Sequence, residues 1–313
     1  DDLGRIHVLD AEARRVVVFD GTGRHLWSAG RKGEGPGELS RPLGQVVTPD
    51  GESLVLDMSK PTLVGFRDGK GTAGRRLPFP FYGGPMAFQH EDLLLLFQEG
   101  PEAFQALIRI TPSGDTAVVR GRKGATPRPV TFASCGISIS GMPPLFDPVI
   151  RWDARGSLLA VAPEAAYRIE VYRGARLVRV VTRDLELRRA DRAAALSEVG
   201  EGLRIGTPGG ERVCDPAEVV EQRGFVPEMP WIGGVWLGPT GGLWVERFTP
   251  GSDDTGPVDL FDASGAYIGT LPAGTPLPLA FLPDGRVLVK EADEVTDVER
   301  LVVGRVRIGG SGE

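Results

Sequence analysis

Five segments of the chain repeat one pattern, in which a turn containing glycine is followed by a run of residues typical of a β-strand. The two clearest copies are residues 4–10 and 51–57, which end at Asp10 and Asp57. Looser copies lie at residues 156–161, 241–246 and 285–291. Repeats spaced by roughly 40 residues are typical of a β-propeller, in which each repeat forms one four-stranded blade.

The other strand-like segments extend these copies to six antiparallel blades. The turns between third and fourth strands support this count, because residues 19–23 and 261–265 are near copies and residues 110–114 resemble them. Aspartate and serine favour such turns by bonding nearby backbone N–H groups, and glycine supplies the positive φ. In blade one, the innermost strand would lie before Asp1. The sequence therefore predicts an all-β chain that forms one six-bladed propeller domain over residues 1–313.

Two long segments interrupt the blades. The first, residues 121–148, joins blades three and four, and the second, residues 183–230, joins blades four and five. Residues 190–198 are rich in alanine and other good helix formers, so we expect one short helical insertion there. Insertions in a propeller lie on one face or on the rim, where long functional loops are common.

Composition and charge narrow the class of protein. The chain has 313 residues, of which 41% are hydrophobic, and this suits one large core. Its net charge of −6 argues against non-specific binding to nucleic acid. Residues 151–192 hold ten arginines against six acids, whereas residues 246–300 hold eleven acids against four bases. Opposite sides of the ring are therefore expected to carry opposite potentials.

The chain contains no apolar run of the ~18 residues that a membrane-spanning helix needs. It begins at Asp1, in the middle of a repeat. We therefore expect that residues before Asp1, such as an export signal or a lipid anchor, belong to the protein as it is made.

Two cysteines, Cys135 and Cys214, lie in the two interrupting segments. In an oxidising compartment they would form a disulfide that joins these segments. Two unrelated free thiols are the alternative, and the sequence alone leaves both open.

Residues 30–39, GRKGEGPGEL, lie between blades one and two. They resemble the "GRxGxGPGEF" junction of bacterial six-bladed β-propeller proteins related to the NHL-repeat and TolB-like propellers. A shorter echo of this junction lies at residues 121–124, and residues 230–247 and 297–301 also resemble that group. The resemblance implies an extracytoplasmic location, periplasmic in such bacteria, and a binding role more often than catalysis.

The glycine-rich junction is not expected to bind phosphate, because Arg41-Pro42 and a new strand follow it where a phosphate loop needs a helix. The three histidines, His7, His25 and His90, occupy different strand positions and predict no zinc site. The chain contains no asparagine, a common neutral ligand of calcium in propeller hydrolases. We therefore expect no metal ion and no cofactor.

No residue is marked as a nucleophile. Composition does not exclude a Ser-His-Asp triad, but no Gly-x-Ser-x-Gly elbow occurs. The sequence accordingly predicts a protein that is not an enzyme.

Three clusters of aromatic and apolar residues lie in the connecting segments. If exposed, they would form a protein interface, because aromatic residues and methionine dominate binding hot spots. The alternative is that they fill the gaps between blades and cover the ring. The candidate interface residues are Phe79, Phe81, Tyr82, Met142, Leu145, Phe146, Phe225, Met229 and Trp231.

The leading hypothesis is a non-enzymatic scaffold for protein–protein interaction, such as an extrinsic subunit of a larger assembly at a membrane. The alternative is binding of a small ligand or glycan, or lactonase-type hydrolysis, at the central channel. A third hypothesis is a sensor domain of a longer exported chain.

Overall fold

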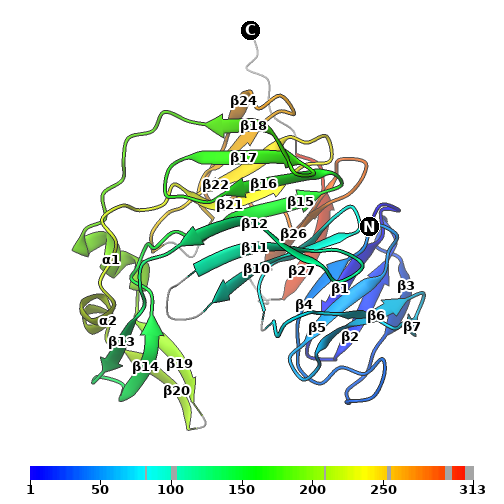
Figure 1. Ribbon diagram of the computed structural model, residues 1–313, viewed down its shortest axis with the longest axis horizontal. Helices are drawn as coiled ribbons and strands as arrows, with labels where there is room; N and C mark the ends of the chain where they lie inside the picture. Colours follow the sequence, from blue (N-terminus) through cyan, green and yellow to red (C-terminus); the bar gives the residue numbers. More distant parts are fainter. Residues whose placement is uncertain (82, 100–103, 208, 252–254, 293–297, 307–313) are drawn as a thin grey trace.

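The computed structural model describes all residues except 82, 100–103, 208, 252–254, 293–297 and 307–313. Its strands form the six antiparallel sheets of a β-propeller, with a smaller body of helices and hairpins at one side (Figure 1). The predicted all-β, six-bladed fold is confirmed.

The first three blades precede the first interrupting segment. Blade one contains β1 (Ile6–Asp10), β2 (Arg15–Phe19) and β3 (His25–Ala29). Blade two contains β4 (Pro42–Val47), β5 (Ser53–Asp57), β6 (Thr62–Arg67), β7 (Lys70–Gly71) and β8 (Arg75–Arg76). Blade three contains β9 (Met86–Gln89), β10 (Asp92–Glu99), β11 (Phe104–Ile110) and β12 (Thr116–Lys123).

The last three blades follow the first interrupting segment. Blade four contains β15 (Arg151–Arg155), β16 (Leu158–Ala162), β17 (Arg168–Arg173) and β18 (Arg176–Thr182). Blade five contains β21 (Ile232–Leu237), β22 (Leu243–Arg247), β23 (Val258–Phe261) and β24 (Tyr267–Leu271). Blade six contains β25 (Ala280–Phe281), β26 (Val287–Ala292) and β27 (Glu299–Gly304). Within the described residues, blades one and six have three strands each.

The repeated turns have the same hydrogen bonds in different blades. Asp20 Oδ1 accepts from the backbone N–H groups of Thr22 and Arg24, at 2.9 and 3.0 Å. In blade five, Asp262 Oδ1 accepts from the backbone N–H groups of Ser264 and Ala266, at 2.8 and 3.0 Å. The near-identical turn sequences thus reflect one local structure, in which a carboxylate satisfies the N–H groups of a tight turn.

The core lies between neighbouring blades. The faces of blades one to five pack in consecutive pairs through separate clusters of buried aliphatic and aromatic side chains. Trp244 of blade five meets Phe281 of blade six edge to face, with ring centroids 5.6 Å apart. Leu282 and Leu288 of blade six pack on Ile6 of blade one, which brings the first and last blades together.

Two helices occur among the described residues, both between blades four and five. Helix α1 (Arg192–Val199) lies where the alanine-rich segment predicted one, with the Asp191 side chain accepting from Ala194 N at 2.7 Å. Helix α2 (Pro216–Arg223) was not predicted. Its start follows standard rules, because Asp215 caps the helix and proline occupies its first position.

Candidate functional site

The two interrupting segments fold together into one body beside blades three to five. It contains hairpin β13 (Arg128–Phe132) with β14 (Ile137–Met142), helices α1 and α2, and hairpin β19 (Leu203–Thr207) with β20 (Gly210–Cys214). We call this body the lobe. Figure 1 shows both hairpins pointing away from the blades at the lower left. The lobe has its own core, in which Val130, Phe132 and Val219 are buried.

A disulfide joins the two halves of the lobe. It links Cys135, in the turn of the first hairpin, to Cys214 at the end of the second. Glu218 on α2 strengthens the same junction, because its carboxylate accepts from the backbone N–H groups of Ala133 and Ser134, at 2.6 and 3.0 Å. Arg212 Nη1 donates to the Cys135 carbonyl at 2.9 Å. The two hairpins are therefore held as one unit.

Apolar and backbone contacts fix the lobe to the ring. Phe146 of the lobe meets Phe248 of blade five edge to face, with ring centroids 6.1 Å apart. The Arg188 guanidinium lies 4.9 Å from the Trp231 ring centroid, and its Nη1 donates to the Phe248 carbonyl at 2.6 Å. These contacts give the lobe a defined position on the propeller.

The candidate interface residues lie mostly where the lobe or a blade connection covers the ring. Phe81, Leu145 and Phe146 are buried. The half-buried members pack against the same cores and are Phe79, Met142, Phe225, Met229 and Trp231. Tyr82 lies outside the described residues. These side chains are thus buried or half-buried against the cores of the blades and the lobe, and the apolar side chain that the second hairpin exposes is Val213, at 44%.

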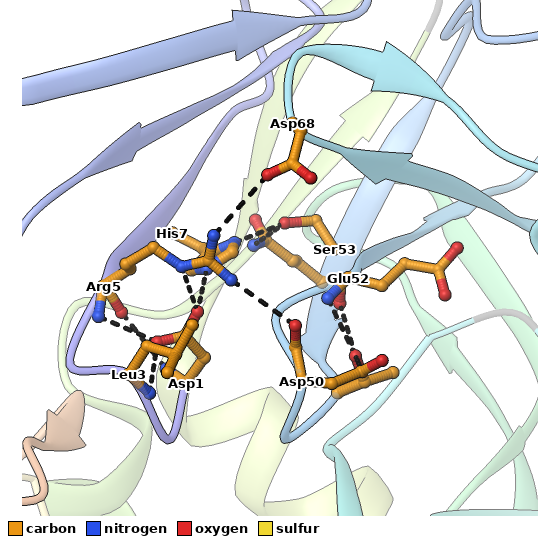
Figure 2. Close-up of polar contacts among 10 residues, drawn as sticks. Asp1, Leu3, Arg5, His7, Asp50, Glu52, Ser53 and Asp68 are labelled. Carbon is orange, nitrogen blue, oxygen red and sulfur yellow. Dashed lines mark hydrogen bonds and ion pairs between the residues drawn. The ribbon is translucent and has the colours of Figure 1, made fainter.

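A second polar cluster joins blades one and two (Figure 2). His7 Nδ1 lies 2.7 Å from Ser53 Oγ, and His7 Nε2 lies 3.1 Å from Asp1 Oδ2. Arg5 Nε donates to the same Asp1 oxygen at 2.6 Å. These partners match the order of a Ser-His-Asp triad, although Ser53 is fully buried. A substrate cannot reach that hydroxyl, so the chain of hydrogen bonds holds the two blades together.

Burial lowers the pKa of His7 to about 4, helped by the neighbouring Arg5 guanidinium. The neutral ring donates from Nε2 to Asp1 and accepts the Ser53 hydroxyl at Nδ1. This cluster has no local signal in the sequence, because Ser53 lies 46 residues from His7.

We expect the free energy of unfolding to fall by about 2 kcal/mol between pH 7 and pH 5 through His7 alone. Below the ordinary pKa of 6.5, the unfolded chain takes up a proton that folded His7 accepts only near pH 4. Urea denaturation at both pH values, in wild type and His7→Gln, measures this difference. His25→Gln, which changes an exposed histidine on β3, should retain the fall. An equal fall in His7→Gln and wild type would contradict the assignment.

The central channel contains a cavity of about 320 Å³. The innermost strands of blades two to six line it together with Asp1 and Asp2. Burial raises the pKa of Asp153 to about 6, against the opposing effect of the Leu237 and Ala154 N–H groups. Both Asp153 oxygens accept these backbone bonds, at 2.7 and 2.8 Å, so the carboxylate links blade four to blade five.

Within the described part of the chain, no group of three or more His, Cys, Asp or Glu side chains is placed to hold a metal ion. The same residues include no helix of the length and apolar character needed to cross a membrane. Asp57 has a structural role, because its carboxylate accepts from the N–H groups of Ser40, Arg41 and Ser59.

No protein-family model matches the chain, and its sequence matches no curated protein. A streptogramin B lyase structure shares 12% identity at a TM-score of 0.42, covering 92% of this chain and 73% of that one. A Bacteroides fragilis protein described as exported shares 14% identity at a TM-score of 0.48, and the match covers 86% of this chain and 68% of that one. Regucalcin, a calcium-binding protein from Agrobacterium tumefaciens, shares 14% identity at a TM-score of 0.35, and the match covers 94% of this chain and 80% of that one. The likeness concerns the fold alone, and the six-bladed propeller is established by the strand order of this chain itself.

Proposed function

We propose that this propeller is an extracytoplasmic binding protein without catalytic activity, which presents its lobe to a protein partner. The observation that supports this most directly is the structure of the lobe. Two segments separated by a whole blade fold into one body, and a disulfide and the Glu218 carboxylate hold its hairpins together. A rigid surface lowers the entropy lost on binding.

The location outside the cytoplasm is supported by the same disulfide, because such bonds persist mainly in oxidising compartments. An extrinsic subunit of a membrane assembly fits this proposal. In that arrangement the ring is the support, and the exposed hairpin residues Arg204, Glu211 and Val213 meet the partner.

Site-specific photo-crosslinking in the native host tests the proposal. A photoreactive residue at position 213 on β20 should yield one discrete adduct with a partner protein. The matched control is position 118 on β12, where Val118 is 60% exposed on the ring. Adducts from position 118 alone, or none from position 213, would refute the role of the lobe.

The alternative is a binding site for a small ligand or glycan in the central channel. The cavity of about 320 Å³ supports this, since it is at the lower end of the range for ligand sites. Its enzymatic version, a lactonase-type hydrolase, would require a bound cation, which elemental analysis of the purified protein would detect.

A further inference from the structure

The outer strand of blade four, β18, has one edge without a partner strand among the described residues. Its side chains Leu177, Val178 and Val180 are 45%, 45% and 37% exposed. An exposed apolar edge strand is a template for pairing with another extended chain, and proteins usually shorten or charge such edges. The outer strand β7 of blade two is shortened to two residues, whereas β18 spans seven and the outer strand β12 of blade three spans eight.

Two arginines lie at the start of this edge. Arg173 and Arg176 are directly opposite each other across the turn between β17 and β18. Both are exposed, and neither side chain has a hydrogen bond or ion pair with any described residue. Like charges directly opposite in an antiparallel pair are destabilising. A partner that brings carboxylates to this end of β18 would remove the repulsion.

We propose that β18 is a docking edge for an acidic, extended segment of a partner protein, which adds to blade four as a fifth antiparallel strand. Backbone hydrogen bonds to β18 supply affinity, and alternate apolar side chains of the segment cover Leu177, Val178 and Val180. Because the added strand runs antiparallel, its acidic residues stand at its C-terminal end, opposite Arg176 and one strand away from Arg173 on β17. This surface goes beyond the proposed role of the lobe, and Figure 1 shows it at the top of the molecule, away from the lobe.

The test uses two capped synthetic peptides and the full-length protein. The acidic probe is Thr-Val-Thr-Val-Thr-Glu-Glu, and the basic probe replaces both glutamates with lysine. We expect the acidic probe to bind about tenfold tighter or more in fluorescence anisotropy. It should also slow amide hydrogen exchange in β18. The double variant Arg173→Glu/Arg176→Glu should reverse the preference in favour of the basic probe.

A matched pair of exposed valines tests the edge itself. Val178→Lys should weaken binding of the acidic probe by about tenfold or more, because it places a charge on the docking edge. Val118→Lys makes the same change on the outer strand of blade three and should leave binding unchanged. Equal binding of both probes, no binding at millimolar peptide, or protection outside β18 would overturn the proposal. Because no lobe residue takes part, these results are independent of the lobe.

Discussion

Replacing Asp259 with alanine is expected to lower the free energy of unfolding by about 3–5 kcal/mol, because it leaves the half-buried guanidinium groups of Arg247 and Arg183 without their partner. Asp259 is fully buried on β23. Its carboxylate accepts from Arg247 Nη2 at 2.6 Å and Nε at 2.9 Å, and from the Tyr167 hydroxyl at 2.7 Å. Arg183, at the start of the second interrupting segment, lies 2.8 Å away. The Asp259 carboxylate on blade five thus contacts Tyr167 of blade four and Arg183 of the segment that leads to the lobe.

The charged form of Asp259 is stabilised in the fold. Burial opposes the charge, but hydrogen bonds from Arg247, Thr270 and Tyr167 outweigh it and lower the pKa of this carboxyl. Hydrogen bonding to Asp259 correspondingly raises the pKa of Arg247. Alanine would therefore remove the one buried acid that these groups share.

Urea denaturation of Asp259→Ala and of Asp262→Ala measures the effect. Asp262 lies three residues further along and accepts backbone N–H groups in an exposed turn. Its loss should cost only about 1 kcal/mol. The assignment would be wrong if the two variants were equally stable, or if Asp259→Ala unfolded like wild type.

Reduction of the Cys135–Cys214 bond is expected to destabilise the protein by about 4.5 kcal/mol. The two cysteines are 79 residues apart, so the bond closes a long loop in the unfolded chain. When the crosslink is lost, the unfolded chain gains conformational entropy. For a loop of this length, that gain lowers the free energy of unfolding by about 4.5 kcal/mol. Cys214 is also fully buried in the lobe core, where the reduced thiol remains packed.

Unfolding of one preparation with and without a reductant measures this difference without any mutation. Mass spectrometry of peptides under non-reducing conditions gives the state of the two cysteines. Identical unfolding curves in both conditions would contradict a stabilising bond. Two free thiols in protein taken from its native compartment would contradict the bond itself.

The blades could be predicted because their signals are local. A glycine turn, an alternating strand and a capping aspartate all lie within a few residues, as in residues 4–10 and 51–57. Helix α2 had a local signal as well. Asp215 is followed by Pro216 and by Glu218 at the third helical position, a recognisable helix start.

The lobe and the buried clusters depend on contacts between distant segments. Phe146 and Met142 belong to a connecting segment, and only the packing of that segment on α1 and α2 decides that they are covered. The His7–Ser53 contact likewise requires blades one and two to be neighbours in the ring. Sequence patterns report local periodicity. They therefore indicate which residues are apolar or polar, but they do not show which of these residues meet in the folded protein.

In the function proposed above, the lobe binds the partner protein and the ring supports the lobe. Once a partner is identified by crosslinking, its dissociation constant for Val213→Lys and Val118→Lys tests this claim most directly. Both variants place a lysine at an exposed valine, one on the lobe and one on the ring. We predict that Val213→Lys weakens binding by about tenfold or more, or about 1.4 kcal/mol, while Val118→Lys binds as wild type does. Equal affinities for Val213→Lys and wild type would contradict the claim.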